Sequence, residues 1–189
     1  ADGITQKTYD FTLNIYEQDP YVISWNQRNT GYLPTSVVSQ KTIAFQNRLI
    51  TYYKSDSAID AMFTNASDGT IWSDANITGL PHTLQLSSLV TANNAAFGLD
   101  ITTDAVYKST DGVNWSPVST QYPVKAIYGE LPLATNGNIL AAVEINGELT
   151  FVETNDFTVL NPLNKLPAGL PVKDFSVTKV DASTSYSIK

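Results

Sequence analysis

The stretch Ser109-Thr110-Asp111-Gly112-Val113-Asn114-Trp115 decides the fold, because its aspartate, glycine and tryptophan recur at the same spacing elsewhere in the chain. Its counterpart, Ser67-Asp68-Gly69-Thr70-Ile71-Trp72, has the same Asp-Gly pair, and tryptophan again follows the aspartate by four residues. A third copy, Asn155-Asp156-Phe157-Thr158-Val159-Leu160, keeps the aspartate and has leucine in the tryptophan position. Self-similarity of this kind indicates a protein built from structural repeats.

Two further landmarks accompany each copy. An apolar residue stands five positions before each aspartate: Phe63, Val106 and Phe151. A proline follows each copy, and Trp25 leads to a proline in the same way, which reveals a fourth pass of the unit: Pro81, Pro123, Pro171 and Pro34. The anchors are spaced by 47, 43 and 45 residues: Trp25, Trp72, Trp115 and Leu160. A period of about 40 to 50 residues is typical of four-stranded propeller blades.

The composition favours strands. Only 15% of the residues are charged, and Thr, Ser, Asn, Val, Ile and Tyr are abundant, as expected of strands and turns. We predict strands at residues 95–102, 104–110, 113–118, 125–133, 139–145, 148–154 and 158–163. Asn146-Gly147, between two apolar runs, is a strong hairpin signal. The sequence therefore predicts an all-β fold, a β-propeller with about four visible blade repeats over residues 25–189, as part of a larger ring.

Charge and composition exclude several classes of function. A net charge of -7 argues against nucleic acid as a partner, because binding to phosphates needs a clustered basic surface. The absence of cysteine excludes disulfides, thiolate nucleophiles and Cys-ligated metals. No apolar run approaches the roughly 20 residues of a transmembrane helix. We expect no metal and no cofactor.

The repeated turn resembles the Asp-box, or BNR, repeat of sialidase-like propellers, whose pattern is Ser-x-Asp-x-Gly-x-x-Trp. The copy around Asp111 is one residue shorter between Asp and Gly, and Ala66 replaces the serine in the copy around Asp68. In such a turn the carboxylate accepts backbone N–H bonds, glycine supplies a positive φ and the indole packs between sheets. The resemblance implies that these turns lie on the face of the propeller that is away from the active site. We therefore interpret six residues as structural: Asp68, Gly69, Trp72, Asp111, Gly112 and Trp115.

A second resemblance rests on the segment Thr8-Tyr9-Asp10-Phe11-Thr12-Leu13-Asn14-Ile15-Tyr16-Glu17-Gln18-Asp19-Pro20, which leads to Trp25. It is similar to the junction between a small β-sandwich and a propeller in secreted or lipid-anchored Bacteroidetes proteins without an assigned function. The resemblance implies that residues 1–24 are lead-in strands from the end of a sandwich, and that the protein is extracytoplasmic. After Pro171 we expect one strand, at residues 172–180. We therefore expect residues 9–15 and 175–180 to contact a second polypeptide or a symmetry mate that completes the propeller, or the intact protein to continue past Lys189 with further chain.

Catalytic residues are hard to assign. Sialidase chemistry, as the resemblance describes it, uses three arginines as a carboxylate clamp, and this chain has only Arg28 and Arg48. Other glycosidases need two carboxylates at a suitable separation. The candidates for these are Asp56, Asp60, Asp100 and Asp104, which we interpret as solvated loop residues. The single histidine, His82, follows a turn proline, and we expect it at the surface or a sheet edge. We assign no catalytic residue.

Binding is the preferred hypothesis. In a propeller the connections between blades surround the channel on one face, and here these are residues 26–33, 73–80, 116–122 and 161–170. They carry amide, charged and aromatic side chains, of which we select Asn26, Arg28, Tyr32, Asp74, Asn76 and Tyr122. Surface loops are polar whether or not they bind. We predict a non-catalytic extracellular binding or adhesion module for a glycan or a surface protein. The alternatives are a sialidase-like glycan-processing enzyme with catalytic residues outside this chain, and a purely structural scaffold.

Overall fold

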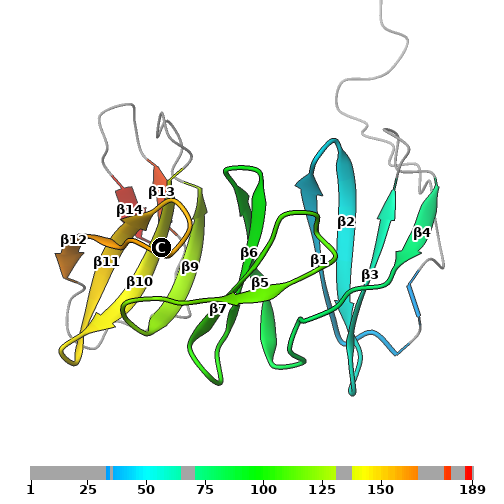
Figure 1. Cartoon of the computed structure of the whole chain (residues 1–189), viewed down its shortest axis with the longest axis horizontal. Helices are drawn as coiled ribbons and strands as arrows, with labels where there is room; N and C mark the ends of the chain where they lie inside the picture. The colour runs from blue at the N-terminus through cyan, green and yellow to red at the C-terminus, as the bar shows by residue number, and fades with distance from the viewer. Residues whose placement is uncertain are drawn as a thin grey trace, which may run out of the picture. The chain divides into compact units, whose positions relative to one another are not determined.

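The structure is a computed structural model that describes residues 33–34, 36–64, 71–130, 138–165, 177–179 and 186–188. Within these ranges the chain forms strands and turns, with no helix (Figure 1). The predicted all-β class is therefore confirmed.

Three four-stranded antiparallel sheets follow one another along the chain. The first contains β1 (Ser39–Phe45), β2 (Arg48–Lys54), β3 (Ile59–Thr64) and β4 (Trp72–Ala75). The second contains β5 (Leu84–Ala92), β6 (Ala95–Asp100), β7 (Ala105–Ser109) and β8 (Ser116–Val118). The third contains β9 (Val124–Glu130), β10 (Ile139–Ile145), β11 (Glu148–Thr154) and β12 (Asn161–Lys165). Each sheet is a meander, because every strand pairs with the strand next to it in the chain.

Tight turns with left-handed backbone connect strands in all three sheets. Gln46-Asn47 joins β1 to β2, Asn93-Asn94 joins β5 to β6, and Asn146-Gly147 joins β10 to β11, with φ between 49° and 81° at all six residues. Two-residue hairpins favour positive φ at both positions because this matches the twist of the flanking strands. Asparagine tolerates that conformation better than most residues. The predicted hairpin at Asn146-Gly147 is confirmed.

Apolar cores fill the two spaces between consecutive sheets. The core between the first and second sheets, here the first core, includes Ile50, Tyr52, Leu84, Leu89 and Trp115. The core between the second and third sheets, the second core, includes Phe97, Leu99, Val106, Val124, Val143, Val152 and Phe157. Strand β6 is buried at every position because it faces both cores, with Ala96 in the first and Phe97 in the second.

The first strands of consecutive sheets lie next to one another, so that β1 contacts β5 and β5 contacts β9. This shared side is visible in Figure 1, where β5 lies between β1 and β9. The three sheets thus pack face to face and share an inner side formed by their first strands.

The repeat predicted from sequence describes this arrangement. Phe63, Val106 and Phe151 lie on the third strands β3, β7 and β11. Phe63 packs on the first core and Val106 lies in the second core, so each faces the following sheet. Phe151 is adjacent in β11 to Val152, which lies in the second core, so Phe151 is on the opposite face, away from the second sheet. The three positions are therefore equivalent, although only Val106 is fully buried.

The anchor residues are equivalent for two of the three described copies. Trp115 lies in the first core and Leu160 in the second, each facing the preceding sheet. Trp72 is half-buried and pairs with Thr64 at the start of β4, whereas Ser116, one residue after Trp115, pairs with Lys108. When the two copies are aligned on their aspartates, the pairing of the fourth strand with the third differs by two residues between the first and second sheets. A shift of two residues keeps each side chain on the same face of the sheet. Trp25, Asp68 and Gly69 lie outside the described residues.

Some strand boundaries differ from those predicted. Strands β8 and β12 begin at Ser116 and Asn161, three residues later than expected, because the repeated turn extends as far as Trp115 and Leu160. The prediction of one strand after Pro171 is wrong: β13 (Val177–Lys179) lies in the expected range and pairs with β14 (Tyr186–Ile188). Residues 1–24, including the predicted contact segment 9–15, lie outside the described residues.

Gly112 marks a close approach between the first two sheets. Its φ is +77°, and a Cβ added there would lie 2.4 Å from Ile50 Cδ1 and 3.3 Å from Phe45 Cδ1. Gly147 has a similar φ of +81° but nothing within 4 Å of an added Cβ. The two glycines therefore share the backbone requirement and differ in packing.

We predict that Gly112→Ala lowers the free energy of unfolding more than Gly147→Ala does. The control carries only the left-handed backbone cost of about 1–2 kcal/mol, whereas Gly112→Ala adds overpacking of about 1–3 kcal/mol against Ile50. Urea denaturation of both variants measures the difference. Equal losses would contradict the close packing of the two sheets at Gly112.

Candidate functional site

The repeated turn in the second sheet is held by the carboxylate of Asp111. Asp111 Oδ1 accepts hydrogen bonds from the backbone N of Val113 at 2.8 Å and of Asn114 at 2.7 Å. The Ser109 hydroxyl donates to the same oxygen at 2.9 Å and accepts from Gly112 N at 2.9 Å. These contacts are local bonds of the kind that we expect of a residue that stabilises its own turn.

The hydrogen bonds determine the protonation of Asp111. Burial by itself raises the pKa of this carboxyl, but the bonds from Asn114, Val113 and Ser109 outweigh it and hold the pKa well below its usual range. Asp111 is therefore ionised throughout the neutral range, and it is committed to its own turn.

The third sheet has a variant of this turn. Asp156 Oδ1 accepts from Thr158 N at 3.0 Å, and Thr154 Oγ1 accepts from Phe157 N at 2.9 Å, as Ser109 does from Gly112. Phe157 has the positive φ of the glycine position, 67°, and its buried ring lies 5.4 Å from that of Phe97. An aromatic side chain thus occupies a backbone position that favours glycine.

The Asp111 turn also binds the first sheet. Its carbonyl groups at Thr110, Asp111 and Gly112 each accept a hydrogen bond from a side chain of that sheet. The donors are Gln46 Nε2 to Thr110 at 2.8 Å, Arg48 Nη2 to Asp111 at 2.7 Å and Tyr52 Oη to Gly112 at 2.6 Å. The link recurs between the second and third sheets, where Asn93 Nδ2 donates to the Asn155 carbonyl at 3.1 Å.

Arg48 is therefore a structural arginine. Besides its bond to Asp111, its guanidinium lies 4.9 Å from the centre of the Phe63 ring. The other arginine of the chain, Arg28, lies outside the described residues. The described part of the chain thus provides no arginine for binding a substrate carboxylate.

The candidate catalytic carboxylates are in separate places. Asp100 is buried and accepts from Thr102 N and Thr103 Oγ1; burial raises its pKa, but these bonds outweigh it and lower the pKa overall. It is not the solvated loop residue that we expected, because it stabilises the turn after β6. Asp104 forms an ion pair of 2.5 Å with Lys125. Asp56 and Asp60 are exposed, as expected, although Asp60 lies on strand β3 and not in a loop.

Lys125 joins two sheets. Its Nζ lies 2.5 Å from Asp104 Oδ2 of the second sheet and 3.4 Å from Glu144 Oε2 of the third sheet, to which Lys125 itself belongs. The hydrogen bond to Asp104 is the main reason that its pKa is raised. His82, the single histidine, has Nε2 3.2 Å from the Ser55 carbonyl and is exposed, in agreement with the surface position expected.

The structure describes three of the six predicted binding residues. Asp74 is exposed on β4, Asn76 is exposed just after it, and Tyr122 is half-buried against the second core between β8 and β9. Burial is the main reason that the pKa of Tyr53 is raised, and the negative charges of Asp60 and then Asp74 raise this pKa further. Asn26, Arg28 and Tyr32 lie outside the described residues, so the predicted site stays a prediction.

The connection that carries Asn76 is held firmly against the second sheet. Thr78 N donates to Val113 O at 3.0 Å, and Trp115 N donates to Thr78 O at 2.9 Å. Thr78 Oγ1 also donates to Asn114 Oδ1 at 2.9 Å. Gly79, with φ +76°, leaves no room for a Cβ, which would lie 2.0 Å from the Trp115 carbonyl oxygen. The connection is thus held against the second sheet by the hydrogen bonds of Thr78 and by the close approach of Gly79 to Trp115.

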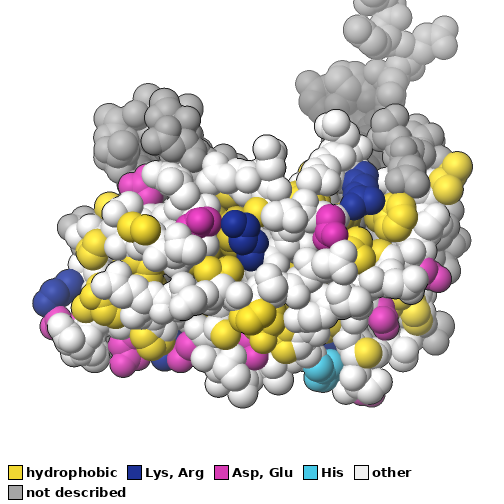
Figure 2. Space-filling view, in the orientation of Figure 1, with side chains coloured by type: hydrophobic (Ala, Val, Ile, Leu, Met, Phe, Trp, Pro, Cys, Tyr) yellow, Lys and Arg dark blue, Asp and Glu magenta, His cyan; other side chains and the backbone are white. Residues whose placement is uncertain are grey.

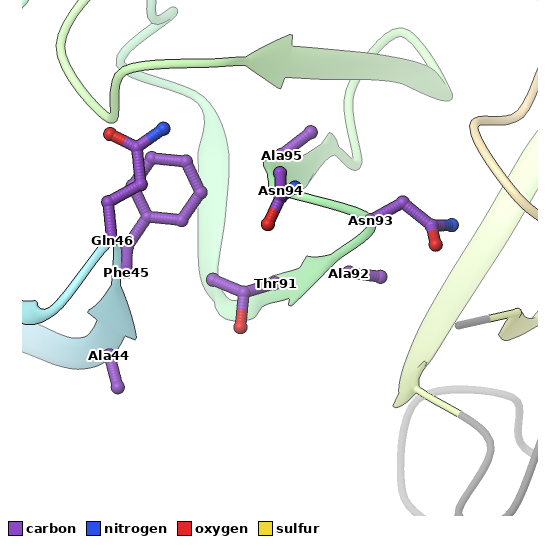
Figure 3. Close-up of a pocket in the computed structure, with 8 residues that line it drawn as sticks. All are labelled: Ala44, Phe45, Gln46, Thr91, Ala92, Asn93, Asn94 and Ala95. Atoms are coloured by element: carbon purple, nitrogen blue, oxygen red, sulfur yellow. The ribbon is translucent and has the colours of Figure 1, made fainter. Parts of the chain in front are cut away.

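A hollow of about 220 Å³ lies at the turns that join β1 to β2 and β5 to β6 (Figure 3). Eight residues line it: Ala44, Phe45, Gln46, Thr91, Ala92, Asn93, Asn94 and Ala95. The sequence analysis did not predict this hollow, because all of its candidate binding residues lie in connections between sheets. The signal available was the paired polar turn residues Gln46-Asn47 and Asn93-Asn94.

Charged side chains do not gather into one patch in the view of Figure 2, where acidic and basic groups are scattered among uncharged ones. Among the described residues no cluster of three or more His, Asp or Glu side chains could hold a metal ion. In the same part of the chain, no helix has the length and apolar character needed to cross a membrane.

Three successive four-stranded meanders that pack face to face and share an inner side define the class of this protein, a β-propeller. Each sheet is one blade. The family described as the DUF6242 beta propeller domain matches residues 19–189, so the chain belongs to this family. No curated protein matches the chain significantly.

We predict that Asp111→Asn reduces the loss of stability in acid. A carboxyl whose pKa is lower in the folded than in the unfolded state stabilises the fold above its unfolded pKa of about 3.9, and this contribution is lost as pH falls towards the folded pKa. Urea midpoints between pH 6 and pH 2 should therefore fall less steeply in the variant, which is less stable at pH 6. Parallel curves for the two proteins would contradict the role of the ionised carboxylate.

Proposed function

We propose that this propeller is a non-catalytic binding or adhesion module that recognises a glycan or a protein surface outside the cytoplasm. One observation carries the proposal: four described groups with suitable chemistry for catalysis are engaged in contacts within or between the blades. Asp100 and Asp111 stabilise turns, Asp104 pairs with Lys125, and Arg48 binds the Asp111 carbonyl.

The turn chemistry supports an Asp-box type of blade. The Ser109 hydroxyl, the Asp111 carboxylate, the positive φ of Gly112 and the buried Trp115 have the roles that the Asp-box resemblance implies. The extracytoplasmic location, and the similarity to secreted or lipid-anchored Bacteroidetes propellers, rest on the sequence resemblance and are part of the proposal.

The binding surface that we propose is formed by the connections between blades. Asp74 and Asn76 are exposed where the first blade leads into the second, and the bonds of Thr78 to Val113 and Trp115 hold this connection in place. A loop that is already ordered loses little conformational entropy when a partner binds. Tyr122, half-buried in the next connection, offers an aromatic ring and a hydroxyl. The other proposed contacts are Asn26, Arg28 and Tyr32.

We expect a glycan array, followed by titration of the best ligand, to detect binding that Asn76→Ala or Asp74→Asn weakens by about fivefold or more, the effect of losing one hydrogen bond. Asp60→Asn is the matched control, because it removes an exposed carboxylate from the neighbouring strand β3. The control should bind normally. Hydrolysis of a fluorogenic sialoside or other glycoside by the purified chain would overturn the non-catalytic assignment.

A further inference from the structure

The hollow between the first two blades has the features of a small ligand site. At about 220 Å³ it is below the range of about 300–1,000 Å³ that suits drug-sized ligands. It is lined by the turn and strand ends of both blades, with Phe45 and Gln46 on one side and Thr91 and Asn94 across from them (Figure 3). Its size therefore suits one small ring.

The lining selects for an uncharged polar ligand. None of the eight lining residues carries an ionisable side chain; alanines and Phe45 supply apolar surface, and three amides and one hydroxyl supply polar groups. A charged ligand would lose hydration without gaining an ion pair from this lining. A pyranose ring has both kinds of surface, because it has hydroxyl groups at its rim and C–H bonds on its faces.

The turn residues in the hollow have two different tasks. Gln46 and Asn93 donate to carbonyl groups of the following blade, at Thr110 and Asn155, and so fix both turns. The side chains of Thr91 and Asn94 make no hydrogen bond within the described part of the chain. Their hydroxyl and amide groups can thus pair with a ligand without breaking a contact between blades.

We infer that this hollow binds a single neutral pyranose, with Thr91 and Asn94 as its hydrogen-bonding residues and Phe45, Ala92 and Ala95 as its apolar wall. The site is distinct from the binding surface proposed above. Strand β5 runs from the connection that carries Asn76 to the Asn93-Asn94 turn, so the hollow is at its far end. The inference does not depend on binding at the connections.

Chemical-shift titration of the ¹⁵N-labelled chain with neutral methyl glucoside, galactoside, mannoside and xyloside tests the inference. We expect at least one of them to shift the side-chain amide of Asn94 and the backbone signals of Thr91 and Ala95. The methyl glycosides of N-acetylneuraminic acid and glucuronic acid should bind more weakly at this position. No shift with any neutral glycoside, shifts only near Asp74 and Asn76, or stronger binding of the charged sugars would overturn the inference.

Variants separate direct contact from structural effects. Asn94→Gly keeps a residue that accepts φ of 58°, and Thr91→Val keeps the shape of the side chain. Each should weaken binding at least about fivefold, the effect of losing one hydrogen bond. Asn47→Gly is the matched control, because Asn47 has the same turn position in the first blade, with φ 62°, but does not line the hollow. A loss of similar size in the control, or no loss in Asn94→Gly and Thr91→Val, would overturn the inference.

Discussion

The carboxylate of Asp111, which accepts the N–H groups of its own turn, is the interaction on which the packing of the first two blades depends. Because the N–H groups of Val113 and Asn114 are bound inside the turn, its carbonyls at residues 110–112 are left to accept bonds from outside. Gln46, Arg48 and Tyr52 of the preceding blade supply these. A local turn motif thus becomes a contact between blades, and the Tyr52 ring packs edge-on against Trp115 at 5.7 Å beside it.

The sequence predicted the parts of the fold that repeat. The Asp-Gly turns, the anchors and the apolar position five residues earlier gave the frame for Val106 and Trp115 correctly, because each is fixed by local spacing and by one face of a strand. The role of Asp100 was not predicted. A carboxylate at the end of a strand, with threonines two and three residues later, is the usual composition of a solvated turn, and only the burial of Asp100 distinguishes it.

The candidate sites were harder to predict, for a physical reason. The hollow is lined by both Phe45 and Asn94, which are far apart in the chain and are brought together by packing between blades. Likewise, Thr78 stands in a polar loop that looks flexible in sequence, yet it pairs with Asn114 of the next blade. The polar turn residues are visible in the sequence, but no local pattern shows which segments of different blades lie together, so spacing and composition could not reveal either contact.

Bonding to backbone carbonyls also explains why the repeat can be degenerate. A carbonyl acceptor is present whatever side chain stands at that position, so Gln46 and Asn93 make equivalent links to Thr110 and Asn155 although the sequences of the two turns differ. Phe157 shows how far the substitution can go. It accepts the left-handed backbone of the glycine position, a cost of about 1–2 kcal/mol, and gains a fully buried ring against Phe97. Since much of the contact between blades is made through backbone groups and apolar cores, the exposed side chains of the connections and the hollow are free to differ between blades, as the ligand recognition that we propose would require.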